Sequence, residues 1–315
     1  MYYIGIDIGG MSIKAGIVND NLEIINKSTI VTDRNGDYKV MARDIYNLIM
    51  KITKDSNISM DKIKSIGIGC PGSVDRDNGV IIFSNNIVMK NVPLKDEIAK
   101  YTDKPIYLCN DADCAALGEF YALDSDDINT FIVITLGTGI GSGIIYNKKL
   151  LKSFNHSGGE LGHTVIVTDG EYCTCGRHGC FEAYASATAL MKLTKEEGEK
   201  NPDSLVYKMI KENNNKATGR IPFEAARKND KTGQKIVDTY VKYLSEGLIN
   251  IINVFQPEVI AIGGGVSKEG ENLLEPVREY VSGKTYGAGL VTPTKIVTAK
   301  LGNDAGIIGA AYLGR

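Results

Sequence analysis

The 315-residue sequence has little that would suit a nucleic-acid-binding protein or a membrane protein. Its formal net charge is −2, and no block of lysine and arginine stands out. Proteins that bind nucleic acid usually carry a basic patch, so the charge argues against that role. No stretch approaches the roughly 20 apolar residues needed to span a bilayer, and residues 1–5 form no basic leader. We therefore expect a cytoplasmic protein that binds neither nucleic acid nor membrane.

Cysteine is also scarce, and the few cysteines differ in their setting. Cys70, Cys109 and Cys114 are scattered and have no second metal ligand nearby. In a reducing compartment such isolated thiols are seldom paired in disulfides. We expect these three to be small buried apolar residues.

The remaining cysteines form a cluster with one histidine, in the spacing H-x9-C-x-C-x4-C, made of His163, Cys173, Cys175 and Cys180. Gly176 and Gly179 allow this loop to fold tightly around an ion. Three thiolates and one imidazole complete a closed tetrahedral zinc site, whereas the alternative is a disulfide or free thiols. The cytoplasmic setting favours zinc.

With 43% hydrophobic and 23% charged residues, the composition is that of an ordinary globular protein, and the length suits two cores. Residues 4–8 and 131–136 are typical of buried strands, and each is followed by glycines and a second apolar strand. When the two segments are superposed, Gly9 falls on Gly137. This indicates two similar domains that each open with a glycine-rich hairpin, unless the short match is a chance resemblance.

Between and beyond these hairpins, strand and helix patterns alternate, which indicates the α/β class. We expect further strands at residues 63–69, 105–109 and 259–262, helices at residues 40–54, 182–195 and 236–255, a helix starting near Ala112, and a loop over residues 71–93.

Three glycine turns follow apolar strands, where ligands usually sit in α/β proteins. They lie at residues 7–10, 137–143 and 263–265. The second one is not a dinucleotide fingerprint, because a strand rather than a helix follows it. A P-loop, G-x-x-x-x-G-K-[ST], is absent too. Gly283-Lys284-Thr285 matches its end, but the position of its first glycine is occupied by Arg278. A glycine turn can bring backbone N–H groups close to phosphate oxygens, although many such turns bind nothing.

The first turn carries two charged residues that suit a nucleotide. Asp7 ends its strand with a carboxylate that could hold the water shell of Mg²⁺, and Lys14 could neutralise phosphate charge. Charged residues beside such glycine turns are typical of the actin-like ATPase fold, in which ATP lies in a cleft between two related domains. The predicted nucleotide-binding residues are Asp7, Gly9, Gly10, Lys14, Gly137, Thr138, Gly139, Gly263, Gly264 and Gly265.

Several of these motifs together resemble the ROK family of repressors, open reading frames and sugar kinases. The most specific is Glu160-Leu161-Gly162-His163 followed by Cys173-Thr174-Cys175-Gly176-Arg177-His178-Gly179-Cys180-Phe181-Glu182. Asp7-Ile8-Gly9-Gly10, Pro71-Gly72, Asn110-Asp111-Ala112 and Gly263-Gly264-Gly265 match further family motifs in the right order. The resemblance covers nearly the whole chain, and the pattern looks most like the bacterial glucokinases of the family.

The resemblance implies an actin-like ATPase (ribonuclease H-like) fold with duplicated domains. We expect a smaller domain of residues 1–114 with about 301–315, and a larger domain of residues 115–300 that carries the zinc loop. It also implies ATP and Mg²⁺ as cofactors, a structural Zn²⁺, a hexose substrate and a homodimer.

By resemblance, Asp111 is the general base that takes the sugar hydroxyl proton. Read from its position alone, the same residue could equally be a helix N-cap. Asn110, Glu160, His163 and Glu182 are expected to bind sugar hydroxyls, His163 using one ring nitrogen for zinc and the other for sugar. Asn86 is expected to close the pocket, with surface-loop duty as its alternative.

Three functions remain open at this stage. Glucokinase is favoured, with a kinase for N-acetylmannosamine, fructose or allose as the alternative. A sugar-responsive repressor of the family would carry a helix-turn-helix before its first hairpin, and here the hairpin starts at Tyr2. A non-catalytic sugar-sensing protein is favoured only if Met11, which stands where the family usually has Thr, spoils ATP binding.

Overall fold

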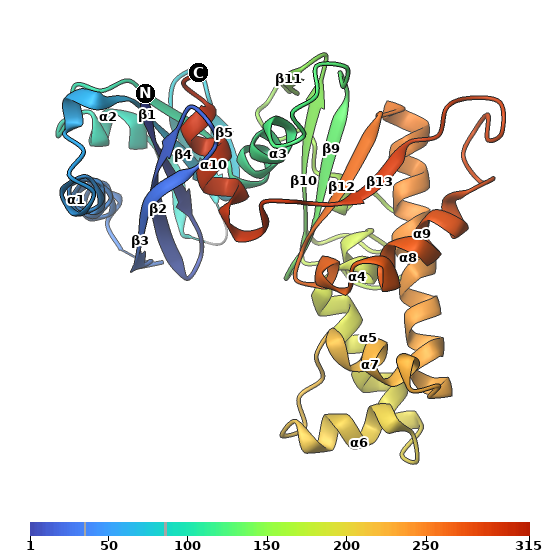
Figure 1. Cartoon of the computed structure of the whole chain (residues 1–315). Coiled ribbons are helices and arrows are strands. Elements are labelled where there is room, and N and C mark those ends of the chain that lie inside the picture. The colour runs from blue at the N-terminus through green and yellow to red at the C-terminus, as the bar shows by residue number, and fades with distance from the viewer. Residues whose placement is uncertain (35, 85–86) are drawn as a thin grey trace. The chain divides into compact units, whose positions relative to one another are not determined.

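A computed structural model describes residues 1–34, 36–84 and 87–315, and strands and helices alternate along them (Figure 1). The chain forms two compact units. The first unit contains Met1–Asp127, Gly143–Gly159 and Lys300–Arg315, and the second contains Ile128–Ser142 and Glu160–Ala299. Within the described ranges, none of the helices combines the length and the apolar character that crossing a membrane requires.

Two five-stranded sheets share one strand order. The first runs β3 (Ile24–Val31), β2 (Ser12–Asn19), β1 (Tyr2–Ile8), β4 (Ile63–Cys70) and β8 (Ile106–Asn110). The second runs β11 (Lys149–Leu150), β10 (Ile140–Tyr146), β9 (Phe131–Leu136), β12 (Val259–Gly264) and β13 (Lys295–Thr298). Numbered along the chain within each sheet, both have the order 3-2-1-4-5. The matching order agrees with the duplication that the two glycine hairpins predicted.

Helices cover both faces of the first sheet. On one face, α1 (Tyr38–Asp55) packs against β2 and β3, and its buried apolar side chains belong to the same core cluster as Ile4 and Ile6 of β1. On the other face lies α10 (Ala305–Tyr312), whose backbone meets β1 and β4 at Gly5 and Gly67. A Cβ atom at either glycine would overlap a carbonyl oxygen of α10, so the strand sequence alternates isoleucine with glycine. The short helix α2 (Leu94–Ile98) precedes β8.

The contact between α10 and α3 (Asp111–Tyr121) is equally close, because Gly309 lies against the backbone of α3 at Cys114 and Gly118. This packing fixes α3 against the sheet. Its N-terminus therefore lies at the edge where the parallel strands β1, β4 and β8 end.

The second unit holds most of the remaining helices: α4 (Glu182–Ala185), α5 (Ala187–Lys200), α6 (Leu205–Glu212), α7 (Arg220–Arg227), α8 (Lys231–Phe255) and α9 (Glu271–Val281). The longest, α8, buries an apolar stripe with the helical period that the sequence predicted, including Tyr240, Leu244 and Leu248. It ends at Gln256, which adopts the left-handed conformation just before Pro257. Short 3-10 helices are η1 (Met60–Lys62), η2 (Leu161–His163), η3 (Val266–Glu269) and η4 (Gly302–Asp304).

The prediction of a loop over residues 71–93 is wrong, because this segment forms a three-stranded antiparallel sheet of β5 (Ser73–Asp75), β6 (Val80–Ser84) and β7 (Met89–Val92). A side chain creates its first turn. Asp75 Oδ1 accepts the backbone N–H groups of Asp77 and Asn78, and Gly79 follows with φ of +71°. Such a turn joins two strands in a hairpin.

The predicted helix over residues 182–195 is in fact two helices, α4 and α5, separated at Ser186. Ser186 is extended (φ −72°, ψ 164°), and its side chain accepts the N–H of Ala189. Serine is a strong N-cap residue, and the cap starts a new helix here. The interruption turns the chain so that the start of α5 meets the second glycine turn.

Candidate functional site

The predicted site residues of the first unit lie at one edge of its sheet. β1, β4 and β8 are parallel, and their register pairs Asp7 with Gly69 and Cys70 with Asn110. The chain therefore delivers Asp7, the Pro71-Gly72 turn and Asn110 to the same carboxyl-end edge. This edge is where open α/β sheets bind ligands.

Asp7 and Lys14 face each other across the hairpin of β1 and β2. Lys14 Nζ lies 3.0 Å from Asp7 Oδ2, and the Asp7 side chain is 19% exposed. Opposite charges at this distance hold each other in place. The pair offers one anionic and one cationic group beside the first glycine turn, as Mg²⁺ and phosphate require.

Two residues that follow β3, Thr32 and Arg34, hold the first glycine turn in place. The sequence motifs did not single them out. Thr32 Oγ1 donates to the carbonyl oxygen of Gly9 (2.7 Å), and Arg34 Nε donates to that of Gly10. Met11 projects from the turn with 78% of its surface exposed. No motif could have revealed Thr32 and Arg34, because their role depends only on how β3 ends beside the turn.

Asn110, and not Asp111, is the N-cap of α3. Asn110 Oδ1 accepts the N–H groups of Ala112 (2.8 Å) and Asp113 (3.2 Å), and its Nδ2 donates to the carbonyl oxygen of Gly72 (3.0 Å). Asp111 is the first residue of the helix, and its Oδ1 accepts from Ala112 N at 2.9 Å. The capping position is thus filled by its neighbour, and the Asp111 carboxylate stands at the positive end of the helix dipole.

Three buried thiols lie around this edge. Cys70, Cys109 and Cys114 are fully buried, which confirms their predicted character as small core residues. Burial raises the pKa of Cys70, and the charges of Asp111 and Asp7 raise it further. The Cys70 thiol therefore stays neutral at any physiological pH and adds no charge beside the two carboxylates.

In the second unit, two glycine turns are neighbours. β9 and β12 run parallel, and their register pairs Gly263 with Thr135 and Gly264 with Leu136. The turn after β9 closes with a bond from Gly137 N to the carbonyl oxygen of Gly139 (3.0 Å). Gly264 has φ of +87°, and a Cβ atom there would overlap the backbone of Leu136. Glycine is therefore required where the two turns approach each other.

Glu160 precedes the short helix η2 and His163 is its last residue, and η2 lies beside the start of β10. Leu161 N donates to Ser142 Oγ (3.0 Å), and Gly162 lies against the carbonyl oxygen of Ile140. Glu160 is exposed, and His163 is half-buried. The two side chains thus stand within three residues of each other and close to the second glycine turn.

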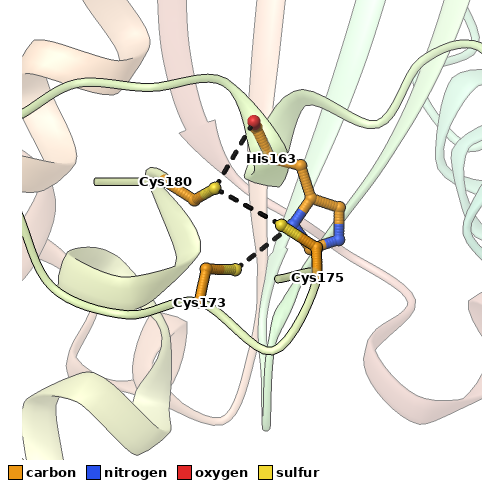
Figure 2. A group of neighbouring side chains, drawn as sticks. All are labelled: His163, Cys173, Cys175 and Cys180. Carbon is orange, nitrogen blue, oxygen red and sulfur yellow. Dashed lines mark hydrogen bonds between the residues drawn. The ribbon is translucent and has the colours of Figure 1, made fainter. Parts of the chain in front are cut away.

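The four predicted metal ligands come together (Figure 2). One ligand atom from each of His163, Cys173, Cys175 and Cys180 lies within 4.8 Å of all the others. Cys175 Sγ is 3.6 Å from Cys180 Sγ, and Cys173 Sγ is 3.6 Å from His163 Nδ1. A tetrahedral zinc ion with Zn–S bonds of about 2.3 Å separates two sulfur atoms by about 3.8 Å. The residues fit zinc in number, type and spacing.

The pKa values of the three thiols in the cluster are shifted in different directions. Burial raises the pKa of Cys173, and it raises that of Cys180 to about 12. Cys175 is exposed; burial acts to raise its pKa, but hydrogen bonds from the Arg177 backbone and the neighbouring thiols set it below the usual value. Two buried thiols with raised pKa values beside one with a lowered pKa suit a site whose thiols a zinc ion would deprotonate on binding.

Glu182 lies between this cluster and the second glycine turn. Its Oε2 accepts the N–H of Ile140 (2.8 Å), and its Oε1 is 3.4 Å from Thr174 Oγ1. A Cβ atom at Gly139 would overlap Glu182 Oε2, so a larger residue there would require the Glu182 carboxylate to move. The sequence predicted a sugar-binding role for Glu182 and did not reveal this link to the turn.

The predicted site residues thus fall into two groups, one in each compact unit. The first group contains Asp7, Gly9, Gly10, Lys14, Asn110 and Asp111, and the second contains Gly137–Gly139, Glu160, His163, Cys173, Cys175, Cys180, Glu182 and Gly263–Gly265. Asn86, which was predicted to contact the sugar, lies outside the described residues.

Comparison with known proteins relates the whole chain to one family. A family model described as ROK family matches residues 3–315. A glucokinase from Thermotoga maritima is 38% identical over 98% of this chain and 96% of its own length. An N-acetylmannosamine kinase from Haemophilus influenzae is 32% identical over 99% of this chain and 95% of its own length. The crystal structure of a ROK family glucokinase from Streptomyces griseus, with glucose and AMPPNP, superposes with a TM-score of 0.83 at 30% identity, covering 99% of both chains.

Proposed function

The chain belongs to the ROK family and has its actin-like ATPase fold, and from this premise we propose that it is an ATP-dependent hexose kinase whose preferred substrate is glucose. The observation that carries the proposal is the edge of the first sheet. There Asp111 begins a helix beside the strand ends that also hold the Asp7–Lys14 pair. A sugar-binding protein without catalysis has no need of this combination of a carboxylate and a phosphate-neutralising pair.

In the proposed reaction, the oxygen of the 6-hydroxyl attacks the γ-phosphorus of ATP, and the bond to the bridging β-phosphate oxygen breaks to release ADP. Asp111 accepts the hydroxyl proton. Lys14 and the backbone N–H groups of the glycine turns stabilise the charge of the phosphate oxygens. Asp7 holds the water shell of Mg²⁺, which supplies further charge neutralisation when bound.

The residues proposed to bind the sugar are Asn110, Glu160, His163 and Glu182. Carboxylates suit this task because each accepts from more than one neighbouring hydroxyl. His163 Nδ1 lies beside Cys173 Sγ, which supports a division of its ring nitrogens, with Nδ1 for zinc and Nε2 for a hydroxyl. His163 and the three cysteines would hold Zn²⁺, which would orient the sugar-binding loop and take no part in phosphoryl transfer.

Glucose is preferred on two grounds. Glu160 and Glu182 offer acceptors and His163 Nε2–H offers a donor for a row of adjacent equatorial hydroxyls, and the Thermotoga maritima relative is a glucokinase. N-acetylmannosamine is the second candidate, because a kinase for it is also related over the full chain. Epimers differ by one hydroxyl that a single partner accepts or rejects, so this choice needs a direct test.

That test is kcat/KM for glucose, mannose, fructose, allose, N-acetylglucosamine and N-acetylmannosamine with ATP and Mg²⁺. We expect glucose to lead. A tenfold higher value for another sugar would overturn the sugar assignment and leave the kinase assignment standing. If no sugar elicits ADP release while calorimetry still detects glucose binding, the chain is a sugar sensor. Met11→Thr at the first turn is then the first substitution to make.

We further propose a homodimer, as the family relationship suggests. Light scattering coupled to gel filtration measures the mass directly, and a monomer at micromolar concentration would refute it.

A further inference from the structure

The segment that follows the cysteine cluster is bonded to the second glycine turn at three points. Residues 182–188 leave the cluster through Phe181, which is fully buried against α8 at Gly247. The three bonds are Ile140 N to Glu182 Oε2 (2.8 Å), Ala187 N to Gly137 O (2.9 Å) and Thr188 Oγ1 to Thr138 O (2.7 Å). The conformation of the turn therefore depends on a segment anchored in the core.

Glu182 differs from the other two contacts because its carboxylate also reaches the cluster. Oε1 lies 3.4 Å from Thr174 Oγ1 and 3.8 Å from Cys173 Sγ, while Oε2 accepts from Ile140. One half-buried side chain thus joins the cysteine loop to the glycine turn. An ionised carboxylate accepts about four hydrogen bonds, so these contacts leave capacity for a sugar hydroxyl.

We propose that Glu182 is a positioning residue for the nucleotide, and that through it sugar binding and nucleotide binding strengthen each other. This inference rests on the proposed kinase function. A sugar hydroxyl bonded to Glu182 holds the carboxylate in the rotamer that accepts from Ile140. The glycine turn is then ordered before ATP arrives. The conformational entropy of the turn is therefore lost only once for the two ligands.

Thermodynamic linkage makes this effect reciprocal. If glucose raises nucleotide affinity by some factor through Glu182, the nucleotide raises glucose affinity by the same factor. Couplings of this kind commonly amount to about 5–150-fold. Since one hydrogen-bonded side chain carries the coupling, we expect a value near the lower end, about five- to tenfold.

The experiment is calorimetric titration with Mg²⁺-AMPPNP, an ATP analogue that is not hydrolysed, with and without saturating glucose. In the wild type, glucose should tighten nucleotide binding about five- to tenfold. In Glu182→Ala, nucleotide affinity without sugar should fall about tenfold. In Glu182→Gln, the amide oxygen still accepts from Ile140, so sugar-free nucleotide affinity should stay within about twofold of the wild type while the coupling to glucose shrinks.

Glu160→Ala is the matched control. Glu160 is exposed and belongs to the same proposed sugar site, but in the described part of the chain its side chain makes no hydrogen bond to the glycine turn. We expect weaker glucose binding in this variant with unchanged sugar-free nucleotide affinity. Glucose affinity alone therefore does not distinguish the two glutamates, whereas sugar-free nucleotide affinity does.

Zinc content and melting temperature establish whether Glu182→Ala is intact. If it is not, Thr188→Val decides, because Thr188 is exposed and this change removes only the bond to Thr138. It should weaken nucleotide binding several-fold with normal glucose affinity. The inference is overturned if sugar-free nucleotide affinity stays within twofold of the wild type in intact Glu182→Ala or, where that variant is not intact, in Thr188→Val. The kinase proposal stands in either case. A wild type that binds no AMPPNP overturns both.

Discussion

Replacing Asp111 with Asn tests the proposed chemistry most directly. The substitution keeps the size and shape of the side chain and removes its ability to accept a proton at neutral pH. Asn110 remains as the cap of α3, with its bonds to Ala112 N, Asp113 N and Gly72 O. Because the cap resides on the neighbouring residue, the change leaves the main helix-starting interactions in place.

The expected effect on catalysis is large and the effect on stability is small. A positioned general base contributes about 10²–10⁴-fold to the rate, or roughly 3–5 kcal/mol of barrier. An acidic side chain in the first turn of a helix contributes only about 0.3–1 kcal/mol through the helix dipole. Asp111→Asn should therefore lower kcat by at least about a hundredfold, while its melting temperature falls by no more than a few degrees.

The assay couples ADP release to a spectrophotometric readout at saturating glucose and ATP, and calorimetry measures glucose binding separately. Glucose affinity should stay close to that of the wild type. Asp113→Asn is the control, since Asp113 lies in the same turn of α3 and loses the same charge. We expect it to retain kcat within a few-fold. If Asp111→Asn keeps activity within tenfold of the wild type, or if both variants lose activity equally, the role of Asp111 as general base is refuted.

Three further perturbations test the cluster, the core and the ion pairs of a buried glutamate with two exposed lysines. Purified protein should contain one zinc per chain, and Cys175→Ser should lose the metal together with glucose affinity, because the same loop carries His163. Elemental analysis measures the zinc and calorimetry measures glucose binding. Zinc-free protein that binds glucose normally would contradict this coupling. Gly309→Ala should destabilise the first unit by about 1–3 kcal/mol, since a Cβ atom would overlap the backbone of α3; an unchanged urea midpoint contradicts this. Hydrogen bonds from Lys235 and Lys200 hold the pKa of Glu197 below its usual range. The stability that these bonds contribute is at most about 1 kcal/mol. It is present above about pH 4.5 and is lost as the pH falls through the lowered pKa. Urea unfolding of Glu197→Gln should show a deficit at pH 7 that shrinks toward pH 3.5, and a deficit independent of pH would count against it.

Local patterns explain why the strands and the grouping of His163 with three cysteines were predictable. Buried strands such as β1 and β9 read as apolar runs that end in glycines, and α8 repeats its apolar residues with the helical period. The cysteine cluster lies within one short loop, so its spacing carries the geometry of a tetrahedral site. In each case the interacting residues are close in sequence.

Where local patterns mislead, a single side chain competes with them. The turn at Asp75 converts an apparent loop into a small sheet, and Ser186 divides an apparent single helix. Likewise, the sequence left the capping of α3 open between two functions for Asp111, and the structure assigns the cap to Asn110. In each case one side chain makes the choice by accepting backbone N–H groups that are only a few residues away.

The sequence by itself therefore determined the α/β class, the paired glycine hairpins and the four members of the cysteine cluster. Only the tertiary structure decided that Glu182 reaches Ile140, 42 positions away, and that Thr32 supports Gly9. Periodicity and spacing are properties of neighbouring residues. Contacts between distant segments depend on how helices and sheets pack, and packing leaves no regular spacing in the sequence to read.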